Sequence, residues 1–255
     1  MTPMMEQYFQ IKEQYRDHLL FYRLGDFYEM FFDDAILASR ELELTLTGRD
    51  CGEPERAPMC GVPFHSSESY IGKLIEKGYK VAICEQVEDP ALAKGLVKRE
   101  VIRVITPGTL IESGFLPEQK NNYLCALYMG EFEFGVCFAD ISTAEVFATV
   151  LDGNNMEARL KSELGTYAPR EIVCNLKAAN MGEIGEFIEG HESILLTDGQ
   201  FARFDCREAT EAVSRQFGDS VRAEDLTNKP LMMAVGAILS YIADTKKVTF
   251  PISRS

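Results

Sequence analysis

The most constraining stretch of this sequence is residues 19–32, in which two short apolar runs are joined by Gly25 and Asp26. Glycine and aspartate tolerate the backbone conformations of tight turns, so the stretch predicts a β-hairpin. The second arm is dense in aromatic residues, and these are enriched in strands. We therefore expect the chain to be organised around a hairpin close to its amino end.

Side chains on a strand alternate between the two faces of a sheet. In the second arm, one face is uniformly apolar and suits a core: Tyr28, Met30 and Phe32. The other face carries Phe27, Glu29 and Phe31, and so places a carboxylate two residues from an aromatic ring. Such a pair is unusual on a buried face, which marks Phe27 and Glu29 for attention.

A second interpretation of the same residues is a helix in which Asp26 is the N-cap and Glu29, three residues on, completes a capping box. Successive helical residues turn by about 100°, which would send Phe27 and Glu29 to nearly opposite sides. Only an extended backbone lets both side chains meet one ligand. A better N-cap at Asp33 or Asp34 favours a strand first and a helix after it.

Length and composition predict a globular protein of two domains. The chain has 255 residues, of which 46% are hydrophobic, and this length exceeds that of a usual single domain. No apolar run approaches the roughly 18 to 20 residues of a membrane span, and the first residues lack the basic and apolar regions of a signal peptide. We expect a cytoplasmic protein.

Cysteine and histidine form no recognisable metal-binding pattern. The seven cysteines contain no Cys-x-x-Cys pair, and most lie in apolar contexts typical of small core residues. The three histidines lie far apart in the sequence: His18, His65 and His191. A zinc site is therefore not expected.

The formal net charge of −14 argues against a protein that coats nucleic acid by bulk attraction. Any contact with a polyanion must be local. The best local cluster of positive charge consists of Lys94, Lys98, Arg99 and Arg103. A phosphate-contacting patch and an ordinary solvated face are both compatible with this cluster.

The two halves of the chain predict different architectures. The first mixes strands and helices in irregular order, which indicates a mixed α/β domain. Within it, residues 57–65 hold two prolines and a glycine and predict a shaped loop, not a regular central strand. Beyond residue 122, three strands joined by short turns predict an antiparallel meander, and alternating helices and strands follow. The second half therefore predicts a mixed sheet with helices on its faces.

The segment 230–243 is apolar almost all round, and Pro230 suits the first turn of a helix. One side of this helix should be buried against something beyond the sheet. The chain then becomes polar and stops without a closing element. We therefore expect it to be the front part of a longer protein.

Common catalytic motifs are absent from the sequence. It contains no phosphate-binding loop, dinucleotide-binding glycine motif, nucleophile elbow or His-Glu-x-x-His string. Asp140 lies on the predicted meander, where carboxylates could hold two metal ions, so a metal-dependent nuclease is the alternative function. Asp140 lacks obvious carboxylate partners, and a role beside Ser142 and Thr143 in a strand-end turn is the simpler interpretation.

Four ordered motifs in the first part of the chain resemble the MutS family of bacterial DNA mismatch repair proteins. They are FYRLGDFYEMF at 21–31, MCGVPFH at 59–65, AICEQVEDP at 82–90 and RVITPGT at 103–109. Residues 123 to about 245 resemble the connector domain of that family by order and pattern more than by motif. The resemblance therefore covers almost the whole chain.

The resemblance implies a domain organisation. Residues 1–110 would be a mixed α/β mismatch-recognition domain, 111–122 a linker and 123–247 a ribonuclease H-like connector domain with a mixed sheet. Residues 248–255 would begin a link to a core domain. The core, clamp and ATPase domains of the family would lie outside this chain, so that no cofactor is expected here and ATP and Mg²⁺ would belong to the ATPase domain.

The resemblance also implies function and partners. Phe27 and Glu29 match the family's Phe-x-Glu pair, which enters the minor groove at a mismatch, where Glu29 would hydrogen-bond the displaced base. Lys98, Arg99 and Arg103 are candidates for DNA-backbone contacts on charge and position. The chain itself would be a DNA-binding module and not an enzyme. Its partners would be double-stranded DNA with mismatches or small loops, a second copy of the full-length protein, and a MutL-like repair protein at the connector domain.

Overall fold

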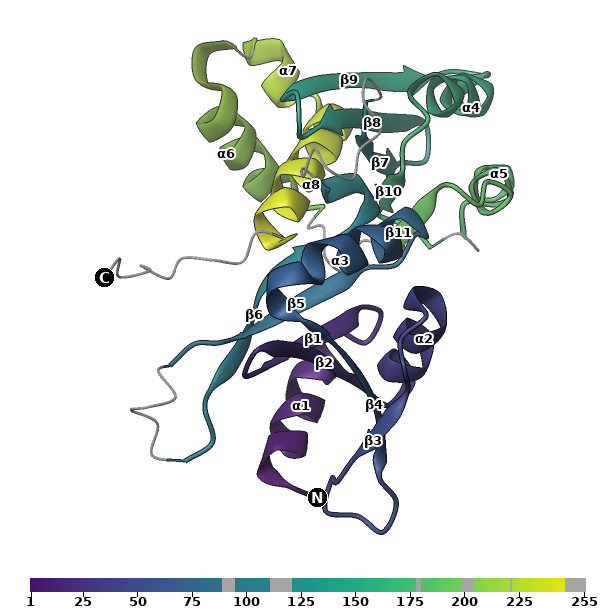
Figure 1. The fold of residues 1–255 in the computed structure, drawn as a ribbon. Coiled ribbons are helices and arrows are strands. Elements are labelled where there is room, and N and C mark those ends of the chain that lie inside the picture. Colours follow the sequence, from purple (N-terminus) through teal and green to yellow (C-terminus); the bar gives the residue numbers. More distant parts are fainter. Residues whose placement is uncertain (89–94, 111–120, 178–179, 199–203, 221, 246–255) are drawn as a thin grey trace. The chain divides into compact units, whose positions relative to one another are not determined.

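The structure is a computed structural model that describes residues 1–88, 95–110, 121–177, 180–198, 204–220 and 222–245. These residues form two compact units, Met1–Thr106 and Pro107–Thr245 (Figure 1). Each unit is built on its own mixed sheet and carries helices, which confirms the predicted α/β class. Among the described helices, none combines the length and apolarity needed to cross a membrane.

The first unit contains a six-stranded sheet with the strand order β3-β4-β2-β1-β5-β6. Strands β1 and β5 are parallel, and the other neighbours are antiparallel. The strands are β1 (Leu19–Leu24), β2 (Phe27–Phe31), β3 (Thr47–Arg49), β4 (Ala57–Pro63), β5 (Val81–Gln86) and β6 (Arg99–Ile105). The helices are α1 (Pro3–Gln14), α2 (Phe32–Leu42) and α3 (Ser67–Glu76), with a 3₁₀ turn at Phe64–Ser66 before α3.

The predicted hairpin is confirmed. Leu24 pairs with Phe27, so that Gly25 and Asp26 alone form the turn. Gly25 has φ +58°, a value that glycine adopts without the steric cost of a Cβ. Strand β2 is extended from its first residue, and the capping-box helix at Asp26 is therefore wrong.

Helix α2 begins earlier than predicted. Its first residue is Phe32, and its N-cap position, Phe31, makes no side-chain cap bond. The predicted cap at Asp33 or Asp34 is wrong, because both residues lie in the first helical turn, where a negative charge favours the helix dipole. Phe32 has φ +52° and leaves the strand, so it does not continue the face of Tyr28.

The prediction of a loop at residues 57–65 is wrong for Ala57–Pro63, which form β4 between β3 and β2. Each proline is nevertheless placed where only one neighbouring strand pairs with it. Pro58 lies opposite Gly48 of β3, before the pairing with β2 starts at Met59, and Pro63 lies opposite Phe27, beyond the end of β3. Each proline is thus locally at an edge of the sheet, where a missing N–H is tolerated.

Helices pack on both faces of the first sheet. On one face, α1 packs onto Tyr22 and Phe31, and the ring of Tyr8 meets both edge to face at centroid distances of 5.5 and 5.1 Å. The opposite face, which includes Met30, is also buried, and α2 and α3 lie on that side. The α1 face thus changes along β2 from fully buried at Phe31 to open at Phe27.

The second unit has the strand order β11-β10-β7-β8-β9. Strands β7, β8 and β9 are the predicted antiparallel meander, and β10 is parallel to both β7 and β11. The strands are β7 (Tyr123–Met129), β8 (Glu133–Asp140), β9 (Glu145–Asp152), β10 (Glu171–Cys174) and β11 (Leu195–Asp198). A meander extended by parallel strands beside its first strand agrees with the ribonuclease H-like fold that the resemblance implied.

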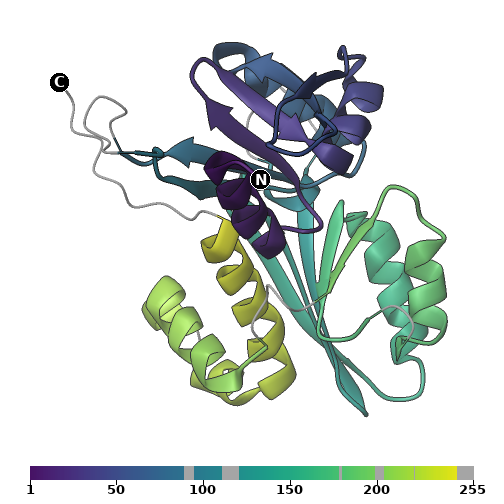
Figure 2. The ribbon, with the colours of Figure 1, turned by 90° about the horizontal axis from the view of Figure 1, so that it is seen from below.

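Helices cover both faces of the second sheet. Figure 2 shows α4 (Met156–Tyr167) and α5 (Glu183–Glu189) on one side and α6 (Cys206–Phe217) and α8 (Lys229–Thr245) on the other. Each side has its own hydrophobic core cluster. The short helix α7 (Ala223–Thr227) was not predicted.

Helix α8 is the predicted apolar segment, and it packs on the sheet with one side and on α6 with the other. Two glycines allow this close approach. A Cβ on Gly135 of β8 would lie 1.9 Å from the carbonyl oxygen of Pro230, and one on Gly236 would lie 2.2 Å from the Cβ of Ala209 in α6. The element beyond the sheet against which this helix was predicted to pack is α6.

Only the last two residues of the predicted linker 111–122 are described, and the buried Asn122 belongs to the second unit, as does the segment that precedes the linker. Pro107–Thr109 form a buried 3₁₀ turn, and the buried Asn122 side chain donates to the carbonyl of Pro107 at 2.9 Å. Residues 111–120 and 248–255 lie outside the described part.

Candidate nucleic-acid interface

Phe27 is the first residue of β2, directly after the hairpin turn, and its side chain is 47% exposed. It is fixed by pairing on both sides, with Leu24 of β1 and Pro63 of β4. The next residue, Tyr28, points to the opposite face and is buried. The backbone condition stated from the sequence, an extended segment with Tyr28 turned inward, is therefore met.

Tyr28 is held by polar contacts as well as by burial. Its hydroxyl donates to the carboxylate of Glu85, and the guanidinium of Arg23 lies 5.6 Å from the centre of its ring. Burial, followed by the bond to Glu85, raises the pKa of Tyr28. Arg23 also stacks on Phe64, at 3.6 Å from the ring centre. These contacts keep the side of β2 opposite Phe27 packed, so that the strand presents Phe27 from a rigid base.

Glu29 lies on the same face as Phe27, two residues along the strand, with 15% of its side chain exposed. Its cross-strand neighbours are Tyr22 on one side and Gly61 on the other. Its carboxylate accepts a hydrogen bond from Nη1 of Arg49, the last residue of β3, at 2.5 Å. The structure thus pairs the candidate carboxylate with a cation that the sequence analysis did not single out.

Tyr22 separates this open end of the face from the core under α1. Its hydroxyl donates to Oε1 of Gln7 at 2.5 Å, and Arg99 donates to the same oxygen at 3.2 Å. Burial raises the pKa of Tyr22 to about 12, with Arg99 acting in the opposite direction. Tyr22 is therefore a buried residue at the edge of the core, directly beside Glu29.

Among the described candidates for phosphate contacts, only Arg99 is buried. Its guanidinium donates to the carbonyl of Arg23 at 2.8 Å and to that of Val97 at 2.9 Å, and it lies over the ring of Tyr22. These contacts are inside the first unit. The described geometry gives Arg99 a structural role in joining β6, α1 and the hairpin.

The other predicted cations differ in exposure. Lys98 is 64% exposed and pairs with Glu100, at 2.5 Å between Nζ and Oε1. Arg103 lies in β6 and is half-buried. Lys94 lies outside the described residues. The structure therefore leaves Lys98 as the most exposed of the described candidates for a phosphate contact.

Asp140, the possible nuclease residue, is buried and satisfied by hydrogen bonds. Its two carboxylate oxygens accept from the backbone N–H of Asn122 at 3.0 Å and from the N–H and hydroxyl of Ser142 at 2.9 and 2.6 Å. Burial opposes ionisation, but these bonds outweigh it and lower the pKa of Asp140. The geometry agrees with the strand-end turn.

No group of three or more metal-ligating side chains lies together in the described part of the chain. The described residues therefore give no support to the nuclease alternative.

Burial raises the pKa of the Cys84 and Cys137 thiols to about 12, which disfavours their reactive thiolate form.

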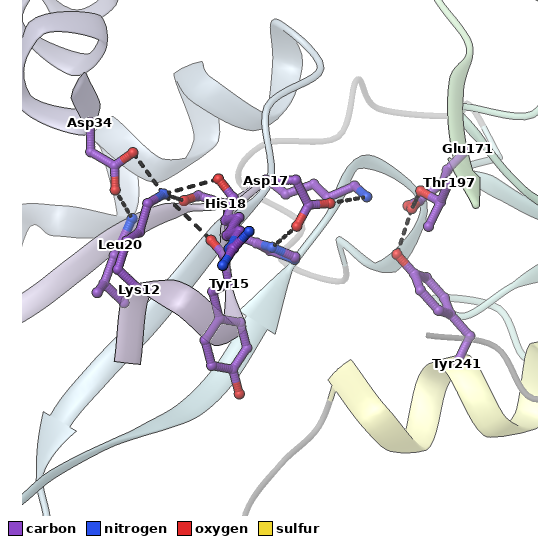
Figure 3. A network of polar contacts seen from close by, with 11 residues as sticks. Lys12, Tyr15, Asp17, His18, Leu20, Asp34, Glu171, Thr197 and Tyr241 are labelled. Carbon is purple, nitrogen blue, oxygen red and sulfur yellow. Dashed lines mark hydrogen bonds and ion pairs between the residues drawn. The ribbon is translucent and has the colours of Figure 1, made fainter. Parts of the chain in front are cut away.

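A polar network supports the base of the hairpin (Figure 3). At the start of α2, the carboxylate of Asp34 accepts from Nζ of Lys12 at 2.8 Å and from the N–H of Leu20 at 3.0 Å. Burial raises the pKa of Asp34, and Lys12 opposes that shift. Asp17 lies 2.7 Å from Nδ1 of the buried His18 and pairs with Lys80 at 3.1 Å. The network ties α1, the start of β1 and α2 together.

In the second unit, the carboxylate of Glu171 is fully buried. It accepts a hydrogen bond from the N–H of Gly108 at 3.0 Å. It also accepts from the hydroxyl of Thr197 at 2.7 Å and from that of Tyr241 at 2.6 Å (Figure 3). The donors come from the 3₁₀ turn, β11 and α8. Glu171 therefore holds three separate segments against the first residue of β10.

Comparison with known proteins gives two family matches. Residues 2–114 match the model of MutS domain I, and residues 122–252 match that of MutS domain II. Together these matches cover nearly the whole chain.

Three relatives named DNA mismatch repair protein MutS illustrate the similarity. That of Acetivibrio thermocellus is 50% identical over 248 residues, which is 97% of this chain and 28% of the relative. Those of Alkaliphilus oremlandii and Caldicellulosiruptor bescii are 48% and 46% identical over 98% and 100% of this chain, and over 29% and 28% of their own lengths. The chain thus spans little more than a quarter of the length of these relatives.

Proposed function

The chain belongs to the MutS family, and from this premise we propose that it recognises mismatched or unpaired bases in double-stranded DNA during mismatch repair. Phe27 would enter the minor groove at the mismatch, and Glu29 would hydrogen-bond the displaced base. The observation that carries the proposal is the extended start of β2, which puts a half-exposed ring and a carboxylate two residues apart on one open face.

The physical basis of discrimination is the cost of opening the base stack. Inserting an apolar wedge between paired bases costs roughly a few kcal/mol per step, and a mispaired base gives up less stacking and pairing when it is displaced. The insertion of a phenylalanine ring depends on the cost of unstacking and makes no base-specific hydrogen bond. Discrimination by deformability suits a protein that must recognise many different mispairs.

The strand mounting of Phe27 supports this role. A wedge must keep its position while the DNA bends around it, and a residue in a loop would lose conformational freedom on binding. Phe27 is already fixed by pairing on both sides, and Tyr28 is packed beneath it. The insertion would therefore cost little additional ordering of the protein.

Glu29 supplies the polar half of the proposed contact. A base that is pushed out of its pair exposes hydrogen-bonding groups, and leaving these without partners costs free energy. The carboxylate lies on the same face as Phe27 and could bond such a base. Lys98 and Arg103 are proposed to contact the DNA backbone, which positions the protein without specifying sequence.

The test is an affinity comparison with the complete protein that carries this chain. We expect Phe27→Ala to reduce the preference for a duplex with one mismatch over the paired duplex to nearly one, while the protein stays folded. Phe64→Ala is the matched control, since Phe64 is also exposed (40%) but stacks on Arg23, on the side of Tyr28. An unchanged preference in the Phe27 variant, or an equal loss in the Phe64 variant, would contradict the proposal.

The remaining implications of family membership are proposed in the same way. The second unit would act as a connector that relays DNA binding to core and ATPase domains and offers a surface to a MutL-like protein. ATP and Mg²⁺ would act in the ATPase domain, and the full-length protein would be a homodimer in the cytoplasm. This chain would bind DNA without catalysing a reaction.

A further inference from the structure

The ion pair between Glu29 and Arg49 links the open face to β3. These residues are 20 positions apart in sequence, and their side chains meet across β4, which lies between β2 and β3. Both are partly exposed, Glu29 at 15% and Arg49 at 37%. The pair therefore lies at the margin of the core, where its partners can change when a ligand arrives.

Gly61 of β4 is the cross-strand neighbour of Glu29 on this face. It lies opposite Glu29 in the β2–β4 register, and a Cβ there would lie 3.4 Å from the Cγ of Glu29 and 3.2 Å from the carbonyl of Tyr28. A side chain at Gly61 would therefore contact the side chain of Glu29. The alternation of β4 and β3 places Arg49 on the same face as Phe27, Glu29 and Gly61.

We propose that Arg49 is a positioning residue for Glu29 in mismatch recognition, which rests on the function proposed above. Arg49 fixes the direction of the carboxylate relative to Phe27 and compensates its charge as the face approaches DNA. An uncompensated carboxylate would be repelled by the phosphates on both sides of the groove. The guanidinium has five N–H groups, and those not bonded to Glu29 can donate to an oxygen of the DNA.

This role differs from that of a plain phosphate contact. A cation that touches only phosphate strengthens binding to paired and mismatched duplexes alike. A residue that acts through Glu29 changes the ratio of the two affinities, and it loses its effect when the carboxylate is removed. A double-mutant cycle separates the two roles.

The experiment measures affinities for a mismatched and a paired duplex, at one salt concentration, with the complete protein that carries this chain. The variants are Arg49→Ala, Glu29→Gln and the double variant, with Arg49→Lys to retain the charge. Arg56→Ala is the control, because it removes a positive charge from an exposed position of the same domain and leaves the Arg49–Glu29 pair intact. Thermal unfolding of each variant confirms that it is folded.

We expect Arg49→Ala to lower the ratio of mismatched to paired affinity roughly three- to tenfold, and Arg49→Lys to restore part of it. In the Glu29→Gln background, the same change should alter the ratio less than about twofold. Arg56→Ala should leave the ratio unchanged.

An equal effect of Arg49→Ala in both backgrounds, or no effect on the ratio, would overturn the inference. The Phe27→Ala variant in the same assay separates this failure from that of the proposed function. If Phe27→Ala abolishes the preference while the Arg49 cycle shows no coupling, only the positioning role fails. If Phe27→Ala leaves the preference intact, the proposed function fails and the inference fails with it.

Discussion

Glu29 and Glu171 are both carboxylates on strands, but their surroundings are opposite. Glu171 is fully buried and accepts three hydrogen bonds from three segments, whereas Glu29 is partly exposed and bonds to Arg49 of a neighbouring strand. A closed network resists any change of partner because each lost bond leaves a buried polar group unpaired. A single ion pair at an open face can be exchanged for a ligand.

The difference follows from how completely helices cover the strand that carries each carboxylate. Strand β10 lies between β7 and β11, in a sheet with helices on both faces. On β2, the cover by α1 reaches Phe31 and Tyr22 and ends before Phe27. Glu171 therefore stabilises the interior of the second unit, whereas Glu29 of the first unit lies where it can bind a ligand.

The largest expected effect is on the closed network. Glu171→Ala should destabilise the protein by about 3–5 kcal/mol, because three buried donors lose their acceptor and a cavity remains. Calorimetric unfolding measures the change. The control is Glu183→Ala, whose carboxylate is exposed and pairs with Lys161 at the surface, and which should cost less than about 1 kcal/mol. Equal costs for the two variants would remove the distinction between closed and open carboxylates.

A smaller effect is expected where α8 closes the second sheet. Gly135→Ala should destabilise by about 1–3 kcal/mol, since its Cβ would overlap the backbone of Pro230. Gly165→Ala is the matched control, because nothing lies within 4 Å of its Cβ position in α4, and it should stabilise by about 0.5–1 kcal/mol. Urea denaturation distinguishes these opposite signs, and a neutral Gly135 variant would show that the close approach is not required.

The open face predicts a still smaller effect on stability. Phe27→Ala should change the free energy of unfolding by about 0.5 kcal/mol, since half of the ring is already in solvent. Phe31→Ala, on the same face of the same strand, should cost about 3–5 kcal/mol because that ring is fully buried. If both variants lost the same stability, the open end of β2 would be part of the core.

Asp17 is a more exposed carboxylate, with half of its side chain in solvent. Its expected effect on stability is the smallest of this series. The bond to His18, together with Lys80, lowers the pKa of Asp17 in the folded protein. The folded state then binds fewer protons than the unfolded state, so this stabilisation is present above the ordinary aspartate pKa of about 4 and is lost as the pH falls below it. Asp17→Asn should flatten the pH dependence of the melting temperature below about pH 4. An unchanged acid profile in that variant would show that Asp17 contributes nothing to acid sensitivity.

Much of the fold could be predicted from the sequence because its turns and strands are specified by residues that are close together in the chain. The turn residues Gly25 and Asp26 and the alternation along β2 depend only on neighbouring positions, and they predicted the hairpin and the inward Tyr28. The short turns of the meander likewise predicted β7 to β9. Residues 57–65 were misinterpreted because a proline excludes a strand only where both sides are paired, and the short β3 leaves Pro63 with one partner.

The sequence by itself determined the hairpin, the shared face of Phe27 and Glu29, and the family that their motif matches. Only the tertiary structure decided the partners of these side chains: Arg49 bonds to Glu29, and Arg99 is buried against the hairpin and not presented to solvent. The physical reason is the sequence separation of the residues that determine each property. Which way a strand residue points follows from its immediate neighbours, whereas the charge that it meets depends on the register of strands that are distant in sequence.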